Sequence, residues 1–127
     1  MSDVFVSDSA ENILNGHDSK LIQCTGLWDT GAERTGISNS LVKKLALQST
    51  SKIFVNGVNG LFQTDTCIVD LWLSKNFVIR RVDVFKASLI KGIDVLIGMD
   101  IITRGNFSIS NINGKTLFNF SEPETFA

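Results

Sequence analysis

The residues with the clearest chemical potential are Asp29-Thr30-Gly31-Ala32, which follow the apolar segment Leu21–Trp28 directly. A turn after a strand is a place where a rigid scaffold can point a carboxylate into a cleft. Gly31 lets backbone approach a reacting group closely, and the Thr30 hydroxyl can hold the loop by hydrogen bonding. The alternative is an ordinary turn in which the Asp side chain caps the backbone. Asp29 is therefore the candidate catalytic residue.

The cysteines and the single histidine do not suggest a second reactive site. Cys24 and Cys67 are far apart in the sequence, in apolar strand-like segments, so we expect two reduced thiols in the core. His17 cannot build a multi-histidine zinc site and is expected in a surface loop. No metal and no organic cofactor is predicted.

Three segments occur in the order found in one known family. Leu27–Ala32 resembles the active-site loop of retroviral-type (retropepsin-like) aspartic proteases. Asn56–Gly60 is similar to the flap tip of that family, and Val95–Asp100, with Ile97 and Gly98, is similar to its late apolar-apolar-Gly segment. The resemblance covers residues 20 to 120, and the Gly-Met-Asp version looks more like cellular and bacterial relatives than viral enzymes.

The resemblance implies an aspartic endopeptidase that hydrolyses peptide bonds of an extended polypeptide substrate. This chemistry needs two carboxylates so close together that they share one proton. The chain has one Asp-Thr-Gly, so the second carboxylate must come from a second copy of Asp29. The resemblance thus implies a homodimer with the two Asp29 residues at its interface.

The same resemblance implies roles for the neighbouring residues. Thr30 would hydrogen-bond across the dimer beneath the two carboxylates, Gly31 would let substrate backbone reach them, and Ala32 would line the cleft. A hairpin tip would close over the peptide, with Val58 and Leu61 touching substrate side chains; its residues are Gly57, Val58, Asn59, Gly60 and Leu61. The alternative for this tip is an ordinary exposed β-turn.

Several details depart from the viral pattern. The charges of Arg34 and Asp100 suggest an ion pair between the two loops, with two solvated charges as the alternative. Trp28 is expected to pack in the core or the dimer interface. Thr116–Phe120 is the candidate C-terminal dimer strand, whereas the N-terminal partner, near Val4–Val6, is left open, and so is how the dimer is sealed.

The elements that must position Asp29 are mostly strands. Nine Phe, two Trp and ten Gly, with many Val, Ile and Thr, favour short strands joined by turns. Hairpins are predicted across residues 52–73 and 107–120, the second turning at Asn113-Gly114. Helices are predicted at 41–47, capped by a serine, and near 99–104. We expect a mainly β fold, a small closed barrel of the retropepsin type with one or two short helices, forming a symmetric dimer.

Length and charge set the remaining expectations. The 127 residues predict a single domain, 1–127, with an uncertain N-terminal segment 1–19 and a frayed tail 121–127. A net charge of -1 and no basic run longer than two residues argue against nucleic acid or an anionic membrane as partners. The sequence shows no bilayer-length apolar run and no signal-peptide pattern, which predicts a cytoplasmic location.

Two other functions compete with the protease. One is a catalytically inactive retropepsin-like barrel dimer that acts as a peptide-binding or dimerisation module. The other is a generic small-molecule-binding barrel, which no feature favours beyond the β content.

Overall fold

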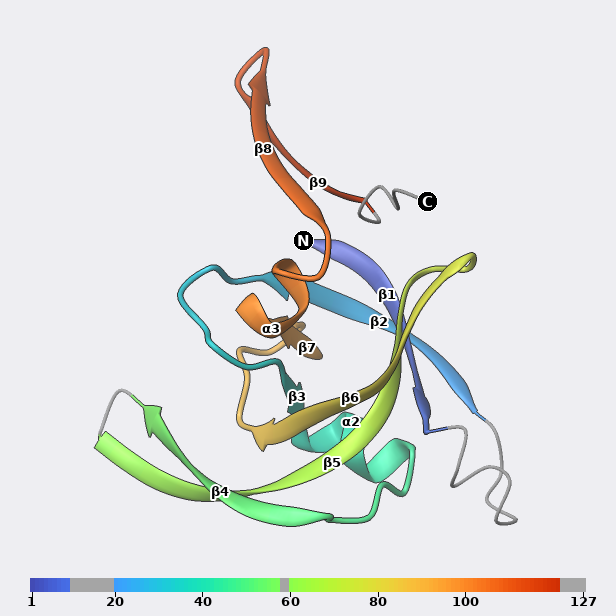
Figure 1. Ribbon diagram of the computed structural model, residues 1–127, viewed down its shortest axis with the longest axis vertical. Coiled ribbons are helices and arrows are strands. Elements are labelled where there is room, and N and C mark those ends of the chain that lie inside the picture. Colours follow the sequence, from blue (N-terminus) through green and yellow to red (C-terminus); the bar gives the residue numbers. More distant parts are fainter. Residues whose placement is uncertain (10–19, 58–59, 122–127) are drawn as a thin grey trace, which may run out of the picture.

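The computed structural model describes residues 1–9, 20–57 and 60–121, and this part of the chain is mainly β-structure (Figure 1). Its strands are β1 Ser2–Asp8, β2 Leu21–Trp28, β3 Gly36–Ser38, β4 Ser51–Gly57, β5 Gly60–Ser74, β6 Phe77–Ala87, β7 Val95–Ile97, β8 Asn106–Ile112 and β9 Lys115–Ser121. Its helices are α2 Asn39–Lys44 and α3 Met99–Ile102. Neither of these described helices has the length and apolar character needed to cross a membrane.

Six strands close into a barrel. The order β1-β2-β7-β3-β6-β5 returns to its start because β1 also pairs with β5. The predicted mainly β closed barrel with short helices is therefore confirmed. β1 has its place within this ring, antiparallel to both β2 and β5. The N-terminal strand, whose partner was left open, thus belongs to the barrel wall of its own chain.

β5 forms part of two structures, a hairpin with β4 and the wall of the barrel. Its first half pairs with β4 in a long hairpin that extends beyond the barrel, and its second half pairs with β1 in the barrel wall (Figure 1). The sequence predicted a hairpin across residues 52–73 here, and its returning strand is the continuous Gly60–Ser74. Gly57 pairs with Gly60 at the open end of the hairpin, and the φ of 104° at Gly60 favours glycine.

The barrel interior is filled by alternating side chains of its strands. Val4 and Val6 on β1 and Val82 and Val84 on β6 are almost fully buried, as period-two alternation requires. Asp70 on β5, also buried, faces a bulge in β6, where its carboxylate accepts hydrogen bonds from Arg80 Nη1 at 2.9 Å and Arg81 N at 3.1 Å. The bulge lets β6 bend, which helps a six-strand sheet to close.

Cys24 and Cys67 are free, buried thiols, as the sequence predicted. Burial, with a smaller contribution from Asp94, raises the pKa of Cys24 to about 12. Burial, with smaller contributions led by Asp83, raises the pKa of Cys67 to about 11. Both thiols are therefore protonated in the folded chain at neutral pH.

The raised pKa values of these two thiols predict that the folded chain loses stability at high pH. Because their ordinary pKa is 9.0, between about pH 9 and 11 the folded chain binds more protons than the unfolded chain. The free energy of unfolding is expected to fall as the pH rises through this range, which denaturant titrations at a series of pH values measure. A variant with both cysteines replaced by alanine should show a shallower fall, and an equal slope in the two proteins would contradict the prediction.

Helix α2 begins two residues earlier and ends three residues earlier than the predicted 41–47. Ser38 is its N-cap, and its side chain accepts a hydrogen bond from Leu41 N, so the predicted serine cap is confirmed. The helix ends at Lys44 because Ala46 adopts a φ of 50°, which cannot continue an α-helix.

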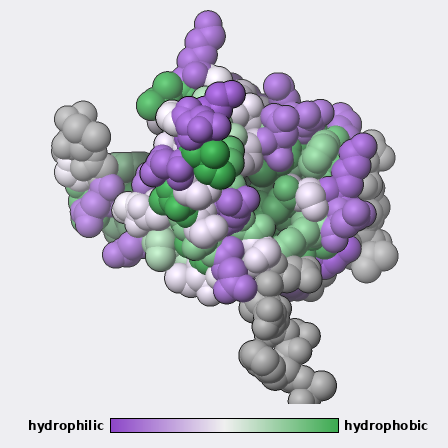
Figure 2. Space-filling model, turned by 90° about the horizontal axis from the view of Figure 1, so that it is seen from above, coloured by the Kyte–Doolittle hydropathy of each residue, from purple (hydrophilic) through white to green (hydrophobic). Residues whose placement is uncertain are grey.

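The hairpin of β8 and β9 is a separate two-stranded sheet that projects from the barrel (Figure 1). It turns at Asn113 and Gly114, whose φ values are 51° and 77°, as in the hairpin turn that this dipeptide favours. The predicted hairpin is thus confirmed. Figure 2, seen from the side of the hairpin, shows hydrophobic residues exposed among hydrophilic ones on this face.

Candidate active site

Asp29 begins an exposed loop at the point where β2 ends. Asp29 N donates to Ile97 O of β7 at 2.9 Å, which fixes the start of the loop on the barrel. The Asp29 side chain points back over the turn, where Oδ1 accepts a hydrogen bond from Gly31 N at 2.8 Å. Thr30 and Gly31 are exposed, and the Thr30 hydroxyl bonds to no residue that the structure describes. These hydrogen bonds hold the start of the loop in place, with the Asp29 side chain half-buried and the next two residues exposed.

The junction between β7 and α3 holds this loop through backbone hydrogen bonds. Met99 N donates to Ala32 O at 2.7 Å, and Asp100 N donates to Glu33 O at 3.2 Å. Together with the bond to Ile97, they secure the loop at three successive points. The two segments that resembled a family pattern, 27–32 and 95–100, are therefore in direct contact.

The expected ion pair between Arg34 and Asp100 is wrong. Arg34 instead bonds to Asp83 of β6 at 3.2 Å. Asp100 is directed at Thr35: its Oδ1 accepts from the Thr35 hydroxyl at 2.7 Å and its Oδ2 from Thr35 N at 3.1 Å. A buried hydroxyl and a backbone N–H satisfy this carboxylate, whereas the longer Arg34 side chain reaches toward solvent and the exposed Asp83.

Gly98 allows the β7–α3 junction and the Asp29 loop to pack closely against each other. A Cβ at this position would lie 2.7 Å from both C and O of Arg34 and 2.9 Å from Ala32 O. Gly98 N also donates to the Thr35 hydroxyl at 3.1 Å. The contact is with backbone, which cannot rotate away as a side chain can, so only glycine fits here.

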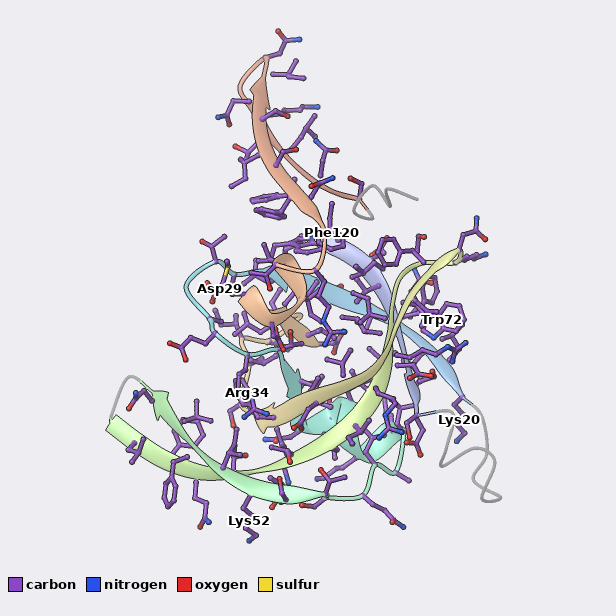
Figure 3. All side chains as sticks on the ribbon, in the orientation of Figure 1. Lys20, Asp29, Arg34, Lys52, Trp72 and Phe120 are labelled. Atoms are coloured by element: carbon purple, nitrogen blue, oxygen red, sulfur yellow. The ribbon has the colours of Figure 1, made fainter. Side chains whose placement is uncertain are left out.

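Trp28 joins the loop to the projecting hairpin. Its ring centroid lies 5.4 Å from that of Phe107 and 5.2 Å from that of Phe120, and its Nε1 donates to the Ser2 hydroxyl at 2.9 Å. Figure 3 shows Asp29 and Phe120 on neighbouring parts of the same end of the molecule. Trp28 thus packs against the hairpin.

The flap candidates are only partly described. Gly57 and Gly60 lie at the open end of the β4–β5 hairpin, and Leu61 is 64% exposed. Val58 and Asn59 fall outside the described residues.

A groove of about 290 Å³ lies between the Asp29 loop and the part of β4 that approaches the open end of this hairpin. The described residues that line it are Gly31, Glu33, Arg34, Ile53, Phe54, Val55, Asn56 and Phe85. Of the residues predicted for the site, the groove includes Gly31, whereas Ala32 and Leu61 do not line it among the described residues. Asp29 does not line the groove; Gly31, whose N donates to Asp29 Oδ1, connects the two. Within the described ranges no three His, Cys, Asp or Glu side chains cluster as metal ligands.

Comparison with known proteins defines the class. The sequence profile of a family described as aspartyl protease matches residues 13–101. The chain belongs to this family of retropepsin-like aspartyl proteases. No curated protein matches the chain.

Among solved structures, the chain is similar to the crystal structure of the retroviral protease-like domain of Ddi1 from Leishmania major. The two share 13% sequence identity over 99% of each chain, with a TM-score of 0.45.

Sequence reasoning missed the residues that support the loop from other elements. Thr35 is fully buried beneath the loop, and Phe85 and Asp83 come from β6. Thr35 lies in a polar stretch with no pattern of its own, so only the fold brings it to Asp100. Phe85 ends the segment Arg81–Phe85, whose alternating charged and apolar residues are typical of a strand. Its place in the groove, however, depends on the pairing of β6 with β3.

Proposed function

We propose that this chain is an aspartic endopeptidase that acts as a homodimer on extended polypeptides, with one Asp29 from each copy. The observation that supports it is the placement of Asp29: it is half-buried at the start of a hydrogen-bonded loop, beside a groove that Gly31 lines and near a hairpin whose apolar side chains are exposed. One domain, residues 1–127, supplies half of this site. The two reduced cysteines favour a reducing, cytoplasmic location.

The proposed reaction uses the two carboxylates as one acid–base pair. At the distance of a shared proton they cannot both ionise, so one is protonated and the pair titrates together. The ionised carboxylate takes a proton from a water whose oxygen attacks the peptide carbonyl carbon, while the other gives its proton to the carbonyl oxygen. As the intermediate collapses, a proton passes to the amine nitrogen and the C–N bond breaks.

The β8–β9 hairpin is the proposed dimer surface. Phe107 lies opposite Phe120 and Ile109 opposite Phe118, so all four side chains share one face of the hairpin. The first pair packs on Trp28, but Ile109 and Phe118 are 53% and 40% exposed. A two-stranded hairpin has little stability alone, and a second copy would cover this face. Because Trp28 precedes Asp29, docking there brings two Asp29 loops together.

Charged substitutions on this face test the dimer. Phe118→Lys is expected to shift the protein to monomer in sedimentation and to abolish peptide hydrolysis at concentrations where the wild type is dimeric, since a buried unpaired charge opposes association. Leu117→Lys is the matched control, because Leu117 is 46% exposed on the opposite face of the same hairpin and should leave both properties intact. A Phe118→Lys monomer with full activity would exclude the shared site.

Hydrolysis itself is tested by incubating the protein with a peptide library and identifying the new termini by mass spectrometry. Cleavage that survives a chelator and a thiol-alkylating reagent, and that incorporates one oxygen from labelled water, supports the proposed reaction. Dimers that bind peptides without cleaving them would favour the inactive peptide-binding module.

A further inference from the structure

The groove beside the Asp29 loop has the chemical features of a selective side-chain subsite. Gly31 of the loop forms part of its wall, so whatever occupies the groove lies next to Asp29. β4 forms the opposite wall and Phe85 of β6 forms part of the floor. A peptide bound at Asp29 would therefore place one of its side chains here.

Of the two charged side chains that line the groove, Arg34 has an ion-pair partner and Glu33 has none among the described residues. Arg34 is paired with Asp83 at 3.2 Å, and Figure 3 shows Arg34 between the Asp29 loop and the β4–β5 hairpin. The exposed Glu33 carboxylate has no ion-pair or hydrogen-bond partner among the residues that the structure describes. The Glu33 backbone is held by the hydrogen bond that its carbonyl accepts from Asp100 N, so its position in the wall is fixed. Glu33 is therefore the charged side chain of the groove that has no partner among the described residues and can pair with a ligand.

The groove also has apolar side chains beside its polar groups. Phe85 is buried, and Ile53 and Val55 are half-buried on β4. A side chain that matches this surface has an apolar stem and a cationic head, which describes lysine and arginine. Their methylene groups would lie along Ile53, Val55 and Phe85 while the head reaches Glu33.

We propose that Glu33 is a specificity residue that selects lysine or arginine in the polypeptide substrate, at the position that occupies this groove. The inference rests on the proposed protease function. In a two-fold symmetric dimer each copy supplies one groove, so a basic residue is favoured at equivalent positions on both sides of the scissile bond.

Peptides that differ only at the selected position test this assignment. The wild type is expected to cleave a lysine peptide with a kcat/KM about fivefold higher than its norleucine counterpart, as a charge-assisted contact at a partly exposed site predicts. Glu33→Gln should remove that preference, and Glu33→Lys should reverse it in favour of a glutamate peptide. Asp3→Asn, which removes an exposed carboxylate on β1 outside the groove, should keep the wild-type preference.

Two outcomes separate this inference from the proposed function. Cleavage by the wild type without a preference for basic residues, or a preference that persists in Glu33→Gln, overturns the role of Glu33 and leaves the protease intact. If no peptide is cleaved, the protease proposal fails, and binding of the same peptides to the wild type, measured by fluorescence anisotropy, decides the subsite. The Glu33 subsite is supported if the wild type binds the lysine peptide more tightly than the norleucine peptide and Glu33→Gln loses this difference. Equal binding of the two peptides by the wild type, or no binding, overturns it.

Discussion

Asp29→Asn is expected to lower kcat for peptide hydrolysis by at least about 10²–10⁴-fold, because it removes the group that exchanges protons with water and substrate. The fold should be unchanged, since asparagine keeps the Oδ1 atom that accepts the hydrogen bond from Gly31 N. Initial-rate measurements on a cleavable peptide, together with a denaturant unfolding curve, check both expectations. Retained cleavage would remove Asp29 from the mechanism.

Mixed dimers make this experiment a test of the shared site. When equal amounts of wild type and Asp29→Asn exchange subunits, about a quarter of the dimers contain two intact copies of Asp29. Activity is expected to fall with the square of the wild-type fraction if each site needs both carboxylates. A fall in direct proportion to that fraction would show that each chain acts alone.

Gly98→Ala is expected to displace the Asp29 loop. Its Cβ would lie 2.7 Å from backbone atoms of Arg34, so the loop or the β7–α3 junction must move. The free energy of unfolding should fall by about 1–3 kcal/mol, as in other overpacked sites. A misplacement of about 1 Å at a catalytic group costs about 10²-fold in rate, so hydrolysis should fall by that order. Unfolding curves and initial rates measure the two effects.

The matched control is Gly92→Ala. Gly92 has a φ of 92° but no heavy atom within 4 Å of an added Cβ, so alanine meets backbone strain without a steric clash. It should cost about 1–2 kcal/mol and leave the rate of hydrolysis unchanged. If Gly92→Ala loses as much activity as Gly98→Ala, general destabilisation rather than the loop position explains the loss.

Local chemistry made much of the fold predictable. The Asn113-Gly114 turn, the Ser38 cap and the alternation of β6 each depend on residues close together in the sequence. The contact between the Asp29 loop and the Gly98 segment followed from family resemblance rather than from such local rules.

Pairings between distant residues were beyond the reach of the sequence. The sequence suggested Asp100 as the partner of Arg34, and it is the pairing of β3 with β6 that brings Asp83 to Arg34 instead. The role of β1 in closing the barrel also depends on β5, some sixty residues away, which no local pattern encodes. Roles assigned to Thr30 and the flap tip stay predictions, because they depend on a second copy and a substrate.

Closure of the barrel also determines where this chain is open to other polypeptides. Each strand of the ring has a neighbour on both sides for at least part of its length, whereas in the described part of the chain β4, β8 and β9 each have a neighbour on one side alone. Unpaired edges invite intermolecular strand addition and aggregation. The three strands with a single neighbour lie at the two places where the proposed function calls for another polypeptide, a substrate along β4 and a second copy at the β8–β9 hairpin. A bound substrate and a bound second copy would therefore also protect these strands from aggregation.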